Sequence, residues 1–373
     1  MSAPTDLLAS RLERLTAVVA AAGLDALVVS HPPNLLYLFG VVASAGLAVV
    51  GPSGVTVLAD ERYREAFAQA AAGIPGVSVA AVSVSSSYEE TLADVLRQAG
   101  ARSAGVEAAS ISLGRASALR RLLTPRGVEL VETDGMVEGL RTVKDSWELA
   151  IFREAGGRLT DVAACILPVV LAGRLERTVA WDIDVALRKG GFERLAFETI
   201  VASGPHSARP HHRAGDRRIE RGDLVVVDFG GVLSGYAVDM TRTVAVGQMT
   251  NDRSEWLRTV ARAQRAAIDV IAPGVRPSQI DAAARDVLVG AGLGERFVHG
   301  TGHGLGLEVH ERPTIGPRGD ATGPIAAGMV FTVEPGVYVP GRGGVRIEDD
   351  VIVTASGVER LTGLVPGFEA HES

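Results

Sequence analysis

Five residues with metal-binding side chains lie in the C-terminal part of the chain, each inside a short motif. They are Asp228 in Val-Val-Val-Asp-Phe-Gly, Asp239 in Asp-Met-Thr-Arg-Thr, His303 in His-Gly-Thr-Gly-His-Gly-Leu-Gly, Glu334 in Phe-Thr-Val-Glu-Pro-Gly and Glu348 in Val-Arg-Ile-Glu-Asp-Asp. Four carboxylates and one imidazole suit two adjacent divalent cations better than one, because a carboxylate can bridge two metals. Such a pair lowers the pKa of bound water and polarises a carbonyl oxygen. The residues therefore predict a dinuclear metallohydrolase.

The charge of these acids supports the same prediction. Four buried carboxylates without cations would repel one another, and they would either take up protons or unfold the site. Taken singly, Asp239 or Glu348 is better interpreted as a turn or strand-end residue. Taken together with a histidine in a glycine-rich segment, the set favours a metal centre.

Histidines near these motifs could move protons. His299, His303 and His310 lie in one segment whose glycines allow close approach of the backbone, and His is the side chain that transfers protons near neutral pH. Nucleotide binding by this glycine-rich segment is a weak alternative, because no Walker Lys-Ser/Thr follows it. His211 and His212 precede the strand that carries Asp228, and we expect one of them to face the metals and the other to be solvated.

His206 and His212 receive no function from the sequence. His206 is interpreted as a surface residue, and His212 is an additional imidazole without an assigned role. Serine or cysteine hydrolysis is disfavoured, because the chain has no Gly-x-Ser-x-Gly motif and Cys165 has no neighbouring histidine.

Composition limits the class of protein. The 373 residues are 47% apolar and 22% charged, as in an ordinary globular protein, and the formal net charge of −7 argues against binding to nucleic acid or a membrane surface. No apolar run is long enough for a transmembrane helix, and no signal peptide is predicted. A single cysteine allows no intrachain disulfide, so we expect a cytoplasmic protein.

The pattern along the chain predicts two domains. Residues 1–138 alternate helix and strand, which indicates an α/β domain: a helix with Leu8, Leu12, Leu15 and Val19 on one face, strands at 26–29, 47–50, 55–58 and about 77–84, and a helix at 61–71. Residues 139–373 indicate an α+β domain. In it, Asp228 and Asp239 belong to one predicted hairpin and Glu334 and Glu348 to a second, so a pseudo-twofold arrangement would bring the four acids together. Ser278-x-x-Asp281 is predicted to cap a helix.

These motifs identify a family. The segment from about Arg141 to the C-terminus resembles the pita-bread metallopeptidases, which include methionine aminopeptidase, aminopeptidase P and prolidase. The Pro-His211 motif, Asp-Phe-Gly-Gly, Asp-Met-Thr-Arg-Thr, Val-His310-Glu and Arg-Ile-Glu-Asp-Asp resemble the proline-specific branch. The first domain is similar in position and pattern to that branch's creatinase-like N-terminal domain. The resemblance implies an α/β N-terminal domain followed by a pita-bread catalytic domain.

The resemblance also implies a role for each metal ligand. Asp228 would chelate one metal, and Asp239 would bridge the two. His303 and Glu334 would bind the second metal, and Glu348 would bridge again. We expect Mn²⁺, with Co²⁺ or Zn²⁺ as alternatives, because oxygen-rich sites accept several cations.

Catalytic and substrate-contacting residues follow from the same motifs. His310 matches the proton shuttle that also contacts the substrate carbonyl, and His211 matches a catalytic histidine on the substrate side. His299 matches a histidine that contacts the substrate or supports a metal ligand. Arg346 and Thr241 lie beside the ligands, where they would orient the carboxylates, and Arg346 is also expected to contact the substrate. Together with Glu348, His310 and His211 form the implied catalytic set.

The activity implied by the resemblance is attack of a metal-bridged hydroxide on an Xaa-Pro bond. The first hypothesis is a dipeptidase (prolidase) acting on small peptides with proline in second position. The second is an aminopeptidase P-like enzyme acting on longer peptides, and the third, from another class, is a non-catalytic pita-bread binding module. The family also implies a homodimer. The residue before proline is not determined by the sequence.

Overall fold

The computed structural model describes residues 3–83 and 85–363, which form two compact units, Met1–Arg141 and Thr142–Ser373. Each unit is described by itself. The predicted division after residue 138 lies inside helix α6 (Met136–Thr142). Within the described ranges, none of the helices has both the length and the apolar composition needed to cross a membrane.

The first unit is built on one six-stranded sheet. Its strand order is β4-β3-β2-β1-β5-β6, with antiparallel pairs β1–β2 and β2–β3 and parallel pairs elsewhere. The strands are β1 (Ala26–Val29), β2 (Leu47–Gly51), β3 (Gly54–Asp60), β4 (Val77–Val82), β5 (Ser103–Glu107) and β6 (Glu129–Thr133). The four predicted strands are confirmed as β1 to β4, although Val84, the predicted end of the fourth, lies outside the described residues.

Helices complete the first unit. They are α1 (Thr5–Ala21), α2 (Pro32–Phe39), α3 (Arg64–Ala71), α4 (Tyr88–Gln98), α5 (Leu113–Leu123) and α6. The predicted apolar face of α1 is buried, because Leu8, Leu12, Leu15 and Val19 recur at helical spacing. The first unit is thus an α/β domain, as the alternating pattern predicted.

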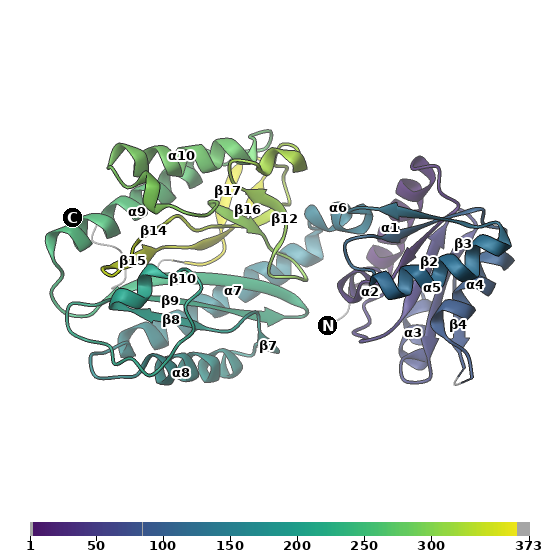
Figure 1. The fold of residues 1–373 in the computed structure, drawn as a ribbon, viewed down its shortest axis with the longest axis horizontal. Helices are drawn as coiled ribbons and strands as arrows, with labels where there is room; N and C mark the ends of the chain where they lie inside the picture. The colour runs from purple at the N-terminus through teal and green to yellow at the C-terminus, as the bar shows by residue number, and fades with distance from the viewer. Residues whose placement is uncertain (1–2, 84, 364–373) are drawn as a thin grey trace. The chain divides into compact units, whose positions relative to one another are not determined.

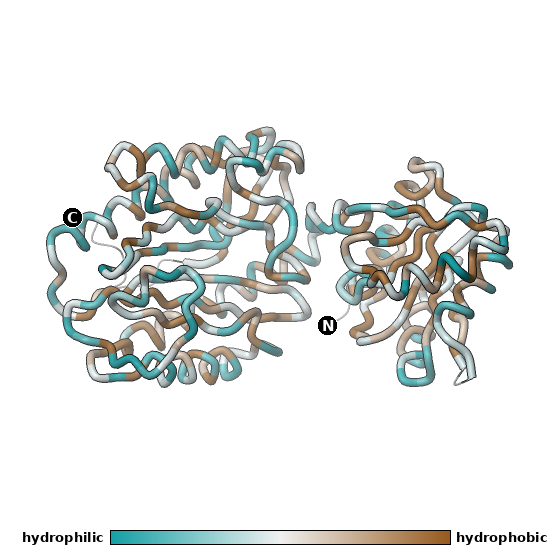
Figure 2. The backbone as a smooth tube through the Cα atoms, in the orientation of Figure 1, coloured by the Kyte–Doolittle hydropathy of each residue, from teal (hydrophilic) through white to brown (hydrophobic). Residues whose placement is uncertain are grey.

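The second unit places strands between helices. Its helices are α7 (Ser146–Ile166), α8 (Glu176–Lys189), α9 (Asn251–Asp269) and α10 (Pro277–Gly290). Figure 1 shows α9 and α10 on one side of the strands and α8 on the other, while α7 packs against β9 and β10. The hydropathy colouring follows this arrangement, since apolar segments run along the strands and inner faces of the helices (Figure 2).

Two larger sheets carry the catalytic motifs. One contains β7 (Arg194–Leu195), β8 (Ile200–Ser203), β9 (Leu224–Leu233) and β10 (Tyr236–Ala245), with β9 paired to all the others. The second has the order β12-β11-β13-β16-β17, formed by β11 (Gly302–Gly304), β12 (Glu311–Ile315), β13 (Val330–Val333), β16 (Asp349–Thr354) and β17 (Gly357–Arg360).

The two predicted hairpins have different outcomes. The first is confirmed, because β9 and β10 pair antiparallel across a tight turn. The second prediction is wrong in its connection: β13 pairs with β16, and a separate small hairpin, β14 (Gly336–Val339) with β15 (Gly343–Arg346), lies between them in the chain. Glu334 and Glu348 therefore sit at the two ends of this inserted hairpin.

One predicted helix cap is also corrected. Helix α10 begins at Pro277, and its capping residue is Arg276. The backbone N–H of Arg276 donates to the side-chain oxygen of Gln279. Ser278 instead donates to Asp320, and Asp281 accepts bonds from the backbone and hydroxyl of Thr301. Both side chains of the predicted cap therefore form hydrogen bonds with residues distant in the sequence instead of capping α10.

Two neighbouring glycines of α7, Gly156 and Gly157, give a matched test of how α7 packs against Leu361. A Cβ atom at Gly156 would lie 2.5 Å from the Leu361 carbonyl oxygen, whereas one at Gly157 would meet nothing within 4 Å. We expect Gly156→Ala to destabilise the protein by about 1–3 kcal/mol, because overpacking displaces α7 from Leu361. Gly157→Ala should stabilise it by roughly 0.5–1 kcal/mol. Urea unfolding measures both, and equal stabilities of the two variants would contradict the packing.

Candidate metal centre and active site

Asp228 and Asp239 project from the same face of one hairpin. In the β9–β10 ladder, Asp228 lies opposite Thr241 and Asp239 lies opposite Gly230, so the two acids occupy diagonal positions. Side chains alternate between the faces of a strand, and residues two apart therefore share a face. Both acids are buried, with 8% and 5% of their surface exposed.

The second sheet supplies the other three residues. Val333 pairs with Asp349 at the end of the β13–β16 ladder. Glu334 and Glu348 are the next residues beyond that end, one on each strand. His303 comes from β11, whose Gly304 pairs with Phe331 of β13. The strand pairing therefore directs two carboxylates and one imidazole toward the same point.

All five predicted ligands line one pocket of about 630 Å³. Within it, Asp239, His303 and Glu348 each offer a ligand atom, and these atoms lie within 4.8 Å of one another. The Nε2 atom of His303 is 3.5 Å from a Glu334 carboxylate oxygen. His211, His299, His310 and Arg346 line the same pocket, so the structure brings together every residue that the motifs singled out for the site.

A buried guanidinium holds the acids in place. Arg346 donates to Asp228 Oδ2 at 2.5 Å and to Thr241 Oγ1 at 3.1 Å. The Thr241 hydroxyl in turn donates to Glu348 Oε2 at 2.6 Å. Arg346 therefore fixes the orientation of the Asp228 carboxylate, and Thr241 fixes that of the Glu348 carboxylate.

A chain of hydrogen bonds fixes His299. Arg346 donates to the Tyr338 hydroxyl at 3.0 Å, and this hydroxyl lies 2.9 Å from His299 Nε2. His299 Nδ1 is 2.7 Å from the Gly300 carbonyl, which can only accept, so Nδ1 carries the proton and Nε2 accepts from Tyr338. Burial lowers the pKa of His299 to about 4, and it also lowers the pKa of His303 to about 3. Both rings are therefore neutral at pH 7, as a metal-binding imidazole must be.

Known proteins match both units of this structure. Residues 150–355 match the model of metallopeptidase family M24, and residues 11–143 match the creatinase/prolidase N-terminal domain. The chain belongs to metallopeptidase family M24. It is therefore an enzyme, which removes the non-catalytic binding module from the three hypotheses, and the predicted pita-bread fold class is confirmed.

Relatives of this M24 peptidase extend over nearly its whole length. The Xaa-Pro dipeptidase of Pyrococcus horikoshii is 32% identical over 96% of the chain and 98% of its own length. The solved structure of the Xaa-Pro dipeptidase from Bacillus anthracis is 34% identical, with a TM-score of 0.90 over 96% of the chain and 98% of the relative. The X-Pro aminopeptidase structure from Thermotoga maritima is 31% identical, with a TM-score of 0.84 over 95% and 98%.

The acids of the M24 peptidase site are strongly perturbed. Burial, followed by repulsion from Glu348 and Asp228, raises the pKa of Asp239 well above its ordinary value. Burial and then repulsion from Glu334 do the same to the pKa of Glu348, and burial raises the pKa of Glu334 itself to about 8. Glu334 therefore holds a proton at pH 7 when nothing else balances its charge, and the other two acids are shifted in the same direction.

The donor set fits the divalent cations expected of an M24 peptidase. Within the described part of the chain, Asp228 Oδ1, Asp239 Oδ1 and Glu348 Oε1 are buried without a hydrogen-bond partner. A buried carboxylate oxygen without a partner is costly, and a divalent cation satisfies it directly. Three such oxygens in one pocket therefore fit a divalent cation.

The structure adds residues that the sequence reading missed. Asp350 accepts the backbone N–H of Asp239 at 2.8 Å, and burial raises its pKa well above the ordinary value. Tyr338 joins Arg346 to His299, and Asp281 anchors the segment before His303 through Thr301. The double acid of Ile-Glu-Asp-Asp was a usable sign for Asp350, whereas nothing local to Tyr338 pointed to the site.

Two histidine interpretations are corrected. His206 is not a free surface residue: its side chain is 28% exposed and its Nδ1 atom lies 3.0 Å from the buried carboxylate of Glu176. His212 is not solvated either, because its side chain is 9% exposed and contacts the same carboxylate at 2.9 Å. Both histidines line the pocket, and His211 is the exposed one of the two.

Metal binding at pH 7 should release protons. Glu334, with a pKa of about 8 in the metal-free state, is mostly protonated at pH 7, and Asp239 and Glu348 are shifted in the same direction. Bound cations require carboxylates, so at least one proton should leave per chain. Titration calorimetry with Mn²⁺ in PIPES and in Tris, which differ in ionisation enthalpy, measures this number, and equal heats in the two buffers would contradict it.

The metal-free protein should also lose stability as the pH rises. The pKa of Glu334 is 4.5 in its ordinary state and about 8 when folded, so the folded state binds more protons between those values. Its contribution is complete below pH 4.5 and lost as the pH rises through about 8. Urea unfolding of chelator-treated protein between pH 5 and 8 tests this sign, with Mn²⁺-loaded protein as the control that should lack the decline.

Proposed function

We propose that this M24 peptidase is a metal-dependent Xaa-Pro dipeptidase, a prolidase, that cleaves small peptides with proline in second position. The observation that carries the proposal is the meeting of five ligand-type side chains in one pocket, three of them with buried oxygens that have no partner among the described residues. The names of the relatives from Bacillus anthracis and Pyrococcus horikoshii support the proline preference.

The proposed ligands divide between two cations. Asp228 and Asp239 would hold the first and His303 and Glu334 the second, with Glu348 as the fifth ligand. We propose Mn²⁺ as the native ion, with Co²⁺ or Zn²⁺ as substitutes, because four of the five ligands are carboxylates. When bound, such cations supply an acidified water and polarise the scissile carbonyl.

The chain's own residues would handle substrate and protons. His310 and His211 line the open side of the pocket, where either can exchange a proton with the leaving nitrogen. Burial, followed by the nearby His211, lowers the pKa of His310, which keeps this ring neutral and ready to accept a proton. His299 and Arg346 would position the peptide, and Glu348 would accept a proton among the ligands.

The pocket wall suits a proline ring. Phe197, Ile200, Pro210 and Val298 line the same pocket as the ligands. Proline presents a tertiary amide without an N–H, so recognition depends on an apolar surface of matching shape rather than on a hydrogen bond to that nitrogen. These four side chains provide such a surface beside the acids.

An aminopeptidase P-like activity on longer peptides is the second candidate. The similarity to the Thermotoga maritima X-Pro aminopeptidase favours it, and both activities would use the same ligands. They differ in whether the space beyond the proline accommodates further residues.

We also propose a homodimer in the cytoplasm. The creatinase-type N-terminal domain supports the dimer, and the one cysteine, Cys165, is exposed and free, as is common in reducing compartments. Light scattering coupled to gel filtration measures the oligomeric state directly.

The first test compares Ala-Pro with Ala-Pro-Ala. Mn²⁺-reconstituted protein should hydrolyse Ala-Pro, and chelator-treated protein should not. A strong preference for Ala-Pro-Ala would transfer the assignment to the aminopeptidase. Absence of metal-dependent cleavage of both peptides would refute the proline specificity.

Removing one proposed ligand tests the site itself. We expect Glu334→Ala to lower kcat/KM by about 1000-fold, equivalent to roughly 4 kcal/mol of lost transition-state stabilisation, while folding stays cooperative. Glu295→Ala, which removes an exposed glutamate of the same domain, is the matched control and should retain activity. Wild-type activity in Glu334→Ala would remove this residue from the ligand set.

A further inference from the structure

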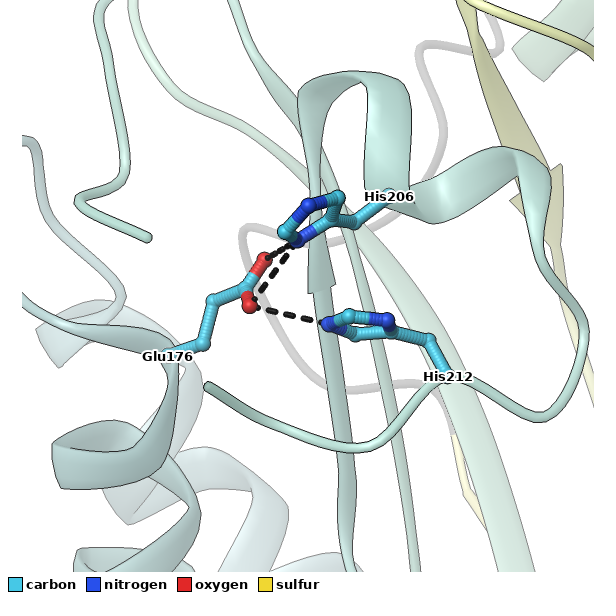
Figure 3. Close-up of side chains that lie close together, drawn as sticks. All are labelled: Glu176, His206 and His212. Atoms are coloured by element: carbon cyan, nitrogen blue, oxygen red, sulfur yellow. Dashed lines mark hydrogen bonds and ion pairs between the residues drawn. The ribbon is translucent and has the colours of Figure 1, made fainter. Parts of the chain in front are cut away.

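A second cluster of metal-binding side chains lies outside the five ligands of the catalytic centre. It consists of Glu176, His206 and His212, and Figure 3 shows both rings directing a nitrogen at one carboxylate. His206 Nδ1 lies 3.0 and 3.1 Å from the two carboxylate oxygens, and His212 Nε2 lies 2.9 Å from one of them. All three offer atoms within 4.8 Å of one another.

Three separate segments meet at this point. Glu176 is the first residue of α8, His206 lies in the short 3₁₀ helix Gly204–Ala208, and His212 follows in the next loop. The two rings face each other with centroids 4.3 Å apart. Local sequence spacing does not produce this convergence, so the tertiary fold has assembled a donor set of two imidazoles and one carboxylate.

The carboxylate is held in a fixed orientation. Ser203 donates to one oxygen of Glu176 from its backbone N–H at 2.8 Å and from its hydroxyl at 2.6 Å, and the Gly215 N–H donates to the other at 3.3 Å. Hydrogen bonds of this kind orient metal-binding carboxylates in proteins. Burial by itself would raise the pKa of Glu176, but the bonds from Ser203 and His212 outweigh it and lower the pKa, so the group is an anion.

This anion is buried and needs a cation. The Glu176 side chain has no exposed surface, and a buried charge is strongly destabilising without a compensating one. Arg217 is the nearby guanidinium, but it donates to Asp223 at 2.6 Å and to the Ser203 hydroxyl, so its charge is shared with a second acid.

We propose that Glu176, His206 and His212 bind a third divalent cation, Zn²⁺, separate from the catalytic pair. Two imidazoles and a carboxylate suit zinc, whereas the carboxylate-rich catalytic centre suits manganese. Zinc ligands at about 2.0–2.1 Å in a tetrahedron lie roughly 3.3 Å apart, so each imidazole nitrogen needs to move away from the carboxylate by only a few tenths of an ångström. The partial exposure of His206 leaves a side open for entry and for a water ligand.

The ion would act on the wall of the catalytic pocket. Pro210, His211, His212 and Arg213 all line that pocket, and they belong to the loop that His206 and His212 tie to α8. A bound cation would therefore help to hold His211 in position. This inference concerns a separate site and does not depend on which peptide the enzyme cleaves.

Metal stoichiometry tests the proposal. Full-length protein, first loaded with Mn²⁺, is dialysed against Zn²⁺ and total bound metal is measured by mass spectrometry. Wild type should bind one more ion per chain than His206→Asn or His212→Gln, and the zinc-induced rise in Tm should be smaller in both variants. His31→Asn, which removes a histidine of the other unit, is the matched control and should bind as wild type does.

Equal metal content in wild type and both variants would overturn the proposal and leave the cluster as a hydrogen-bonded one. Crystals of the zinc-dialysed wild type provide a measurement that does not depend on the folding of any variant. An anomalous peak at the zinc edge among Glu176, His206 and His212 is the expected result, and a map without this peak would also overturn the proposal. Cleavage of Ala-Pro is scored independently, so failure of the activity and failure of this site are distinguishable.

Discussion

The burial of several carboxylates close together is the constraint on which the rest of the catalytic unit depends. Asp239, Glu334, Glu348 and Asp350 all have raised pKa values, chiefly because they are buried together. Arg346 supplies one positive charge to this group, at Asp228. The remaining charge must be balanced by protons or by divalent cations, and the proposed cations would take the place of the protons.

Strand pairing keeps these groups close despite their repulsion. The β9–β10 ladder fixes Asp228 and Asp239 on one face, and the β13–β16 ladder fixes Glu334 and Glu348 beside the pair Val333–Asp349. Helices on both sides bury the ladders, and the apolar core continues through them (Figure 2). A site built on paired strands is held more precisely than one built on loops, which favours reaction geometry set in advance.

One part of the pocket wall is organised differently. It includes the loop around His211, which reaches the fold through Glu176 and its two imidazole contacts. The two histidine-containing groups also differ in donor chemistry, since one is rich in carboxylate oxygen and the other in imidazole nitrogen. A single domain thus offers two kinds of cation site, and His212 belongs both to the second site and to the wall of the catalytic pocket.

Local sequence determined much of this protein. Periodicity located α1 and the first four strands, and short motifs identified the five ligand-type residues and the family, because spacing and turn residues are local properties. Tertiary structure decided the rest. Glu176 contacts His206 and His212, which are 30 and 36 residues away in the sequence. Tyr338 contacts His299 across 39 residues. Asp281 bonds Thr301 instead of capping its helix. Such contacts arise when packed segments bring distant side chains together, and no periodicity along the chain records which segments will meet.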